Sequence, residues 1–481
     1  MTMNKVRLFL SNFFIYGLGG VISKLIPLIM LPIVTRIMPG TEYFGISDMA
    51  TTIISLFSAI AVMGMYDAMY RMFFEKEDDI NYKQEICSTT FLFTLITSLF
   101  ISVVMIIFKN YIAEFFFTNT EYAYLVYITA MATLIGATNS IISAPTRMQN
   151  KKGIFLVANI VSPIISYSVS IPLLLQGYYV IALPLAALIS SCIMEITFYV
   201  LNRKWFSVLK FNKKHLKPLL MIALPLLPNF LIYWLFNSAD KLMITNLLDM
   251  SYTGIYSVAA KIGNISQLIY IAFAGGWQFF AFSTMKEKDQ VESNSKIFQY
   301  LGVVSFVGTV FIFAFSEILF KLLFEDTYWS GFIAAPYLFV APLLQMLFQV
   351  AINQLLVIKK TWPNLIILFV GVIVNIILNF LLIPVLGVEG AALATLSGYF
   401  VSDLICVAVL YKLKLMTMSK KFILSLLLFV LYILCWRFLT LHDYLFNIIL
   451  AILFASVHLF LYRKEIKIFL LSLRKKNETQ L

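Results

Sequence analysis

Charged residues are scarce in this chain of 481 residues. Only 12% are Asp, Glu, Lys or Arg, whereas 61% are hydrophobic. Ordinary soluble domains carry about 25% charged residues, so the composition excludes a soluble globular protein. The 44 phenylalanines and 25 tyrosines suit a surface that faces lipid and the membrane interface.

Cysteine and histidine are also few, which disfavours several kinds of chemistry. The four cysteines (Cys87, Cys192, Cys406 and Cys435) show no CxxC spacing, and none falls in a predicted outer loop. The three histidines are scattered, and no cluster of His, Cys and carboxylates suggests hydrolysis or metal catalysis. We therefore expect no catalytic residues, no enzymatic activity and no metal beyond a monovalent coupling ion.

Long apolar stretches fill most of the chain. About fourteen of them, each roughly 20–30 residues long, can cross a hydrocarbon core of about 30 Å. The first lacks a small-residue cleavage site and is predicted to be a retained helix. We predict an all-α polytopic membrane protein with helices at 8–38, 43–70, 86–108, 121–143, 153–176, 178–201, 216–248, 252–282, 297–324, 331–357, 363–386, 388–411, 420–440 and 443–462.

The basic residues lie mainly in alternate loops. With the N-terminus placed in the cytoplasm, 29 of the 36 lysines and arginines fall on the cytoplasmic side and 5 on the opposite side. The positive-inside rule then places both termini in the cytoplasm. This topology also accounts for the net charge of +12, so we expect no nucleic-acid partner. The predicted outer loops are too short for an extracytoplasmic catalytic domain, which disfavours a glycosyltransferase or polymerase.

The two halves of the chain repeat at an offset of about 210 residues. Each predicted helix hairpin recurs six helices later with the same sidedness, which indicates two six-helix bundles related by a pseudo-two-fold axis along the membrane normal. We place the N-terminal bundle in 1–210, the C-terminal bundle in 211–415, and two extra helices with a basic amphipathic tail in 416–481. The repeated motifs are Tyr43, Gly45, Ile46 and Ser47 with Tyr252, Gly254, Ile255 and Ser257, and the turns that start at Ile171 and Ile383.

Three short motifs carry a resemblance to a known family. They are Gly20–Lys24 followed by Leu31 and Pro32, then Gly64, Ala68 and Arg71, and the turn Ile383–Thr395. With the topology and the repeat, the chain resembles the multidrug/oligosaccharidyl-lipid/polysaccharide exporter superfamily over about residues 5–415. Within that superfamily it is most similar to the polysaccharide-repeat-unit flippases that serve O-antigen, capsule and exopolysaccharide.

This resemblance implies a function. Such flippases move polyprenyl-pyrophosphate-linked oligosaccharides across the bacterial cytoplasmic membrane by alternating access. Membrane lipids and a polysaccharide polymerase or glycosyltransferases are the implied partners. A cation-coupled multidrug exporter is the alternative, but such exporters typically carry an acidic residue in the first helix, where this chain has Lys24.

Two lysines fall inside apolar helices, at positions that suggest a binding role. A charge at the centre of a helix costs about 2.5–3.5 kcal/mol on membrane-insertion scales. Lys24 and Lys261 are predicted at middle-to-outer depth, one from each bundle, where two ammonium groups suit a diphosphate. The structural alternative is that a carboxylate such as Asp48 neutralises each lysine, or that the lysine reaches to the interface. The superfamily's lipid II flippases place functional basic residues on helices 1, 2 and 8, which favours the binding role.

Arg71 and Arg147 are predicted at the cytoplasmic ends of their helices. Arginine presents two parallel donors to a phosphate, so these residues are candidates for guiding a pyrophosphate at the inner mouth. Their alternative role is that of anchors on the positive side of the membrane.

A second group of polar residues is predicted at one depth in the C-terminal bundle: Asp240, Asn375, Asn379 and Thr395. Some lipid II flippases bind sodium through an aspartate on helix 7, polar residues on helix 11 and a threonine on helix 12. The resemblance therefore implies a Na⁺ or H⁺ coupling site, although Asn379 stands where an aspartate is expected. Ordinary hydrogen bonding between helices is the alternative.

Other membrane carboxylates are given structural roles. Glu195 and Asp403 occupy near-equivalent repeat positions, and pairing with Ser, Tyr or Lys is favoured over proton coupling. Glu317 lies near a predicted helix end and is expected to be solvated. Pro225 and Pro228 are predicted to bend the seventh helix, because proline cannot donate the helical hydrogen bond.

Overall fold

The computed structural model describes residues 21–76, 78–358, 360 and 362–467. Within these ranges every regular element is a helix, which confirms an all-α polytopic protein. Twelve described helices are long and apolar enough to cross a membrane, or up to thirteen with one bent pair. The first predicted helix is described only over residues 21–37, where it is helical. Lys5, Arg7 and most of the C-terminal tail lie outside the described residues.

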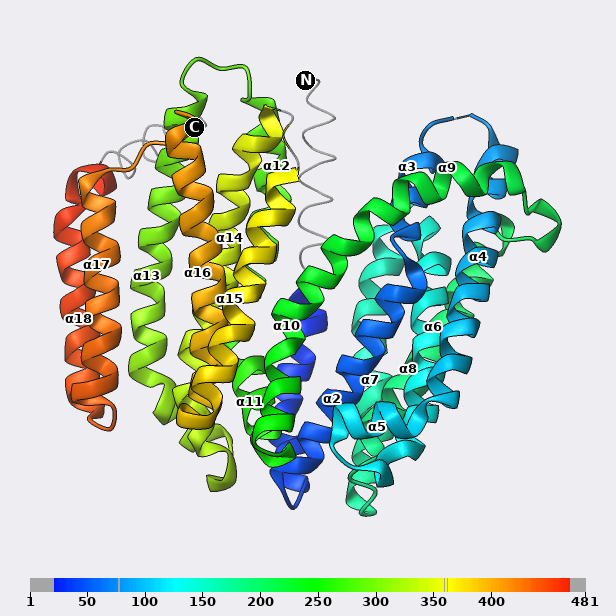
Figure 1. Cartoon of the computed structure of the whole chain (residues 1–481), viewed down its shortest axis with the longest axis horizontal. Coiled ribbons are helices and arrows are strands. Elements are labelled where there is room, and N and C mark those ends of the chain that lie inside the picture. The colour runs from blue at the N-terminus through cyan, green and yellow to red at the C-terminus, as the bar shows by residue number, and fades with distance from the viewer. Residues whose placement is uncertain (1–20, 77, 359, 361, 468–481) are drawn as a thin grey trace, which may run out of the picture.

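The helices form two lobes (Figure 1). The first lobe holds α2 (Thr41–Val62), α3 (Met65–Phe73), α4 (Ile80–Ile107), α5 (Lys109–Phe117), α6 (Ala123–Met148), α7 (Lys152–Leu175) and α8 (Ala182–Asn202). The second holds α10 (Leu227–Leu247), α11 (Met250–Gly263), α12 (Ser266–Ser283), α13 (Gln290–Leu323), α14 (Ala335–Val357), α15 (Trp362–Leu386) and α16 (Val388–Lys412). Outside the second lobe, α17 (Lys420–Cys435) and α18 (Tyr444–Leu461) pack against α13.

Two segments cross between the lobes. The helix at 21–37 belongs to the N-terminal repeat by sequence, yet Leu31 and Val34 belong to a hydrophobic cluster that is built mainly from the second lobe. Conversely, α9 (Lys213–Ala223) packs on α3 and α4 of the first lobe. The chain therefore passes into the second lobe at the 3₁₀ turn Leu224–Leu226, which separates α9 from α10.

Several predicted helices are interrupted. The second one breaks at Met63 and Gly64, which both have positive φ (50° and 77°). The seventh breaks at the turn Leu224–Leu226, which contains Pro225 and is followed by Pro228, and neither proline supplies a backbone N–H for the helical ladder. These two breaks touch each other, because a Cβ on Gly64 would lie 2.6 Å from the carbonyl oxygen of Ala223. The predicted eighth helix is the bent pair α11–α12, with an angle of 46°.

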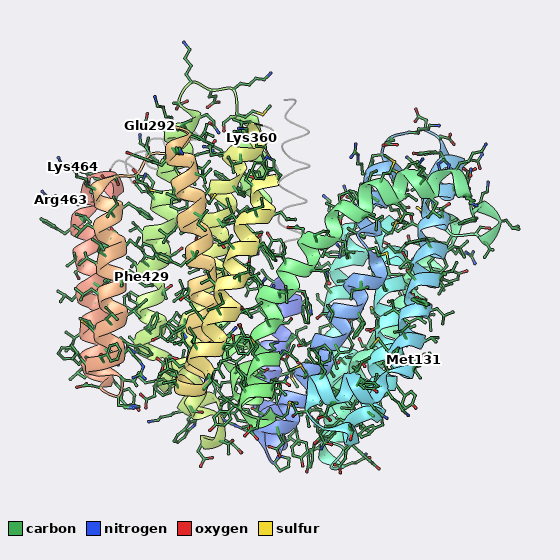
Figure 2. All side chains as sticks on the ribbon, in the orientation of Figure 1. Met131, Glu292, Lys360, Phe429, Arg463 and Lys464 are labelled. Atoms are coloured by element: carbon green, nitrogen blue, oxygen red, sulfur yellow. The ribbon has the colours of Figure 1, made fainter. Side chains whose placement is uncertain are left out.

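The lobes meet at one end and diverge at the other. Figure 1 shows α2, α10 and α11 together at the lower end, whereas α3 and α14 stand apart at the upper end. Figure 2 shows Lys360 at the upper end of the second lobe, and Arg463 and Lys464 at the upper end of α18. These are residues that the charge distribution assigns to the cytoplasm, so by that assignment the lobes are closed on the outer side.

The lower contact depends on the repeated glycine motif. A Cβ on Gly254 of α11 would lie 1.9 Å from the carbonyl oxygen of Thr41, and one on Gly45 of α2 would lie 2.4 Å from that of Met250. Only glycine permits backbones to approach this closely. The equivalent glycines of the two repeats therefore bring the two lobes into direct backbone contact.

Candidate functional site

A polar cavity of about 400 Å³ lies between the lobes. Its walls come from the helix at 21–37, from α2, α7 and α8 of the first lobe, and from Lys261 of α11. Only 6% of the residues in the most apolar 18-residue segment of α7 are buried inside the protein, because one face of α7 lies on this cavity and another faces lipid. The cavity is thus bounded by both lobes, as a site for alternating access requires.

Lys261 stands at the junction of the lobes. Its ammonium group lies 3.3 Å from Asp48 of α2, while its side chain remains 42% exposed toward the cavity. Asp48 also forms an ion pair with Lys241 of α10 at 2.6 Å and accepts a hydrogen bond from the hydroxyl of Ser257 at 2.7 Å. The carboxylate that the sequence suggested as a structural partner of Lys261 is therefore present. Lys261 still has exposed surface available for an anion.

Lys24 is the second predicted cation, and it lies close to the first. Its ammonium group donates to Oε1 of Gln267 on α12 at 3.3 Å, and Lys24 is an exposed residue. Lys261 is near enough to repel it electrostatically. Lys24 itself does not line the cavity, but its neighbour Ser23 does, so the two lysines approach the same region from different helices. A doubly charged anion between them would relieve the repulsion.

Arg71 and Arg147 lie at a distance from this cavity. Both are exposed, at the ends of α3 and α6. Arg147 donates to the hydroxyl of Tyr66 at 3.4 Å and stacks on Phe155, with 4.5 Å between the guanidinium carbon and the ring centroid. Neither arginine lines the cavity between the lobes. Their place in the fold fits a role at the mouth or as anchors.

The four residues predicted to share one depth are in contact with one another, with Asp240 at the centre. Its Oδ1 accepts from Nδ2 of Asn375 at 3.0 Å and from Nδ2 of Asn379 at 2.7 Å. Its Oδ2 accepts from the hydroxyl of Thr395 and from that of Tyr256, the latter at 2.6 Å. All five residues are buried, with at most 5% exposure. Asp240 thus receives four donors from three neighbouring helices, α11, α15 and α16.

This arrangement can be tested for its fit to a monovalent cation. The two amide groups present nitrogen to the carboxylate, whereas a cation needs oxygen ligands. A half-turn of an amide exchanges its nitrogen and oxygen, and Oδ1 of Asn379 is buried without a hydrogen-bond partner among the described residues. A small cavity of about 60 Å³ leads from Asp240 to Gln267, the partner of Lys24. One carboxylate, two amides and two hydroxyls therefore fit such an ion once the amides turn.

Three other carboxylates, Asp403, Glu195 and Glu317, were predicted to have structural roles or to be solvated. Both oxygens of Asp403 and Oε2 of Glu195 are buried without a hydrogen-bond partner among the described residues. The expected Ser, Tyr or Lys partner is therefore missing for Asp403, and Glu195 accepts from Thr138 instead, at 2.6 Å. The prediction for Glu317 is wrong. It is only 7% exposed and is paired with Lys321 of the same helix and with the hydroxyl of Tyr444 of α18.

Two residues of the site were not predicted from sequence. Lys241 is one of the five basic residues that the charge count places on the outer side, and no sequence pattern singles out Tyr256 as a site residue. The sequence held a signal for Lys241, because adjacent helix positions point in different directions. Asp240 can therefore face α15 and α16 of its own lobe while Lys241 reaches Asp48 of the other lobe.

The sequence of this chain is similar to those of known proteins. The sequence model of a family described as "Polysaccharide biosynthesis protein" matches residues 33–334. An uncharacterized membrane protein of Methanocaldococcus jannaschii, MJ1068, is 28% identical over 159 residues. That match covers 31% of this chain and 31% of the archaeal protein, so it spans less than a third of the relative.

Solved structures show the same fold. The lipid II flippase MurJ, in an inward closed conformation, gives a TM-score of 0.70 at 17% identity over 95% of this chain and 99% of that chain. An inward-facing multidrug resistance MATE transporter gives 0.63 at 14% identity, over 83% of this chain and 94% of that chain. A MOP superfamily transporter from Pyrococcus furiosus gives 0.54 at 15% identity, over 84% of this chain and 95% of that chain. These structures share the fold of this chain, and the family match shows that the chain belongs to the polysaccharide biosynthesis protein family.

Proposed function

We propose that the protein is a flippase for a polyprenyl-diphosphate-linked oligosaccharide in the bacterial cytoplasmic membrane, with both termini in the cytoplasm. The observation that carries this proposal is the pair of lysines at the junction of the lobes, Lys24 and Lys261. Both are cations at membrane depth, and Lys261 faces a cavity that is large enough for part of a glycolipid. Such charges are costly in a membrane unless they bind something.

The geometry suggests how the lysines act. In the closed outer contact, Lys261 shares Asp48 with Lys241. A diphosphate that enters from the open side offers Lys261 a second anionic partner. Lysine is a compact, mobile charge and releases a phosphate more readily than a bidentate arginine does, which suits a carrier that must let its substrate go. Arg71 and Arg147, on the open side, are proposed to guide the diphosphate toward the cavity.

We also propose that the group around Asp240 couples transport to Na⁺ or H⁺. Asp240, Asn375, Asn379, Thr395 and Tyr256 supply the oxygen atoms, and bound Na⁺ would neutralise the single carboxylate. Asp240 adjoins Lys241 in the sequence, so a change in its hydrogen bonding affects the helix that carries a contact between the lobes. A sodium gradient should then drive transport in vesicles, and Asp240→Asn should abolish that dependence while leaving substrate binding intact.

The experiment for the main proposal is complementation of a flippase-null strain at matched protein levels, with surface polysaccharide as the readout. Lys24→Ala and Lys261→Ala should lose most activity, and the arginine variants should keep part of it. Lys109→Ala is the matched control, because Lys109 binds Tyr127 within the first lobe. Asp48→Asn separates binding from the lobe contact: it should impair transport less than Lys261→Ala does. Full activity of both alanine variants would contradict the proposal, and drug resistance conferred by the protein in place of polysaccharide would favour a multidrug exporter.

A further inference from the structure

The wall of the cavity that α7 and α8 form has a different chemistry from the side that carries Lys261. Among the described residues no acidic or basic side chain of these two helices lines it. Its polar groups are hydroxyls and amides, set among Pro163, Tyr167, Leu183 and Ala187: Asn159, Ser162 and Ser166 from α7, and Ser190 and Ser191 from α8. The spacing of the α7 residues, i, i+3 and i+7, places them on one helix face.

Polar atoms on this wall lack hydrogen-bond partners. Nδ2 of Asn159 is buried without a partner among the described residues, and so is Oγ of Ser47, a residue of the adjoining α2 that is 5% exposed. Pro163, one turn after Asn159, has no N–H to donate, so the carbonyl oxygen of Asn159 lacks its usual helical hydrogen bond. Buried polar groups are normally paired, and unpaired ones indicate a ligand or water. The wall therefore offers both donors and acceptors to the cavity.

Part of the wall is held rigid by its own contacts. Ser190 donates to the carbonyl oxygen of Ser162 at 2.7 Å, and the two hydroxyls lie 3.0 Å apart. This contact joins α7 to α8. Among the described residues, Asn159, Ser166 and Ser191 have no such contact and remain available to a ligand. A rigid wall that presents polar groups favours selective recognition.

We propose that this wall, centred on Asn159 and Ser191, binds the first sugar of the substrate, with its hydroxyl or acetamido groups, while Lys24 and Lys261 hold the diphosphate. The assignment rests on the proposed function, because it places one part of the same glycolipid. Sugar hydroxyls both donate and accept, and so does the wall. Because no charged side chain of α7 or α8 among the described residues lines this wall, an uncharged sugar is favoured there, and the lysines provide the positive charge for the diphosphate.

Two lipid probes test the assignment: undecaprenyl diphosphate, and the same lipid carrying one N-acetylglucosamine. Native mass spectrometry of the full-length protein in detergent gives the dissociation constant of each. The unaltered protein should bind the glycosylated probe about five- to tenfold more tightly, the equivalent of one or two net hydrogen bonds. Asn159→Leu combined with Ser191→Ala should abolish this preference and leave the affinity for undecaprenyl diphosphate unchanged. Ser191→Ala alone removes one hydroxyl without adding volume and should reduce the preference by a smaller factor.

Two controls separate the parts of the site. Thr197→Val removes a hydroxyl from an exposed position on α8 and should change neither affinity. Lys261→Ala should weaken both probes by the same factor. A preference that survives the double variant, or an equal weakening of both probes by it, would overturn the assignment to this wall. Equal affinity of the unaltered protein for the two probes would also overturn it, while leaving the diphosphate site in place. Binding of neither probe would overturn the proposed function together with the wall.

Discussion

Replacing Asp48 by asparagine tests whether charge holds the lobes together at the outer end. The buried carboxylate of Asp48 meets Lys241 at 2.6 Å and Lys261 at 3.3 Å, and both lysines belong to the other lobe. The amide has nearly the same size and can still accept the hydrogen bond from Ser257. The substitution therefore removes the charge with little change in packing.

The magnitude follows from burial. Removing one partner of a buried ion pair costs about 3–5 kcal/mol. The side chains of Lys241 and Lys261 are 18% and 42% exposed, so water recovers part of this energy. We expect about 1–3 kcal/mol. Because the pairs form only when the outer ends meet, the loss appears as a shift of about 5- to 150-fold toward the state with an open outer end.

Double electron–electron resonance in nanodiscs measures this shift directly. Spin labels at Glu121 and Asp326, exposed on the first and the second lobe, report the separation of the outer ends. The native cysteines are first replaced by alanine. The parent protein should show one short distance, and Asp48→Asn should add a longer one. Lys241→Met should shift the distribution in the same direction.

Lys321→Met is the matched control. Lys321 pairs with Glu317 at 2.9 Å, but both residues lie on α13. This pair is the same in either state of the lobes, so its loss should leave the distance distribution unchanged. An unchanged distribution in both Asp48→Asn and Lys241→Met would refute the reasoning and assign the closed contact to the glycine packing alone.

Three further results are expected. Gly254→Ala should destabilise the protein by about 1–3 kcal/mol in thermal unfolding, because there is no room for its Cβ. Gly308→Ala is the control, since a Cβ there would have nothing within 4 Å, and it should not destabilise the protein. Equal effects of the two substitutions would contradict the packing argument. Arg437→Met leaves the buried Glu389 without the ion partner it has at 2.5 Å and should cost about 1–3 kcal/mol, and an unchanged unfolding temperature would show that the pair contributes nothing. A cysteine at His442 should react with an impermeant maleimide on intact cells; reaction only after permeabilisation would reverse the predicted orientation.

Much of the fold could be predicted because membrane helices obey local rules. Length, hydropathy and the positions of lysine and arginine depend on the sequence within one segment, and the repeat depends on comparison of two segments. The break at Gly64 was not predicted, although glycine carries a local signal. This break also depends on tertiary structure, since Gly64 packs against the carbonyl group of Ala223, directly before the break at Leu224–Leu226.

The candidate site shows the same division. Depth along a helix brought Asp240, Asn375, Asn379 and Thr395 together correctly as neighbours, because residues at one level of adjacent helices meet. Whether they bind an ion stays a prediction. The partner of Lys261 was named as an alternative, but Lys241 was missed. A contact between lobes depends on how two separately folded units dock, and that docking is not encoded in the period of either helix.

The contact between Asp48 and Ser257 has a consequence for how such proteins arise. These residues are 209 apart, the offset that relates Gly45 to Gly254, so at this offset they are counterparts, whereas the match of Ser47 with Ser257 needs an offset of 210. Residues that touch their own counterparts lie on the pseudo-two-fold axis. In a homodimer of single repeats, this position would hold the same residue twice, and two aspartates so close would repel. Only after two copies were fused into one gene could one copy acquire an acid and the other a hydroxyl. Covalent duplication thus permits an acid and a hydroxyl to face each other at the axis, an asymmetric pair that two identical subunits cannot form.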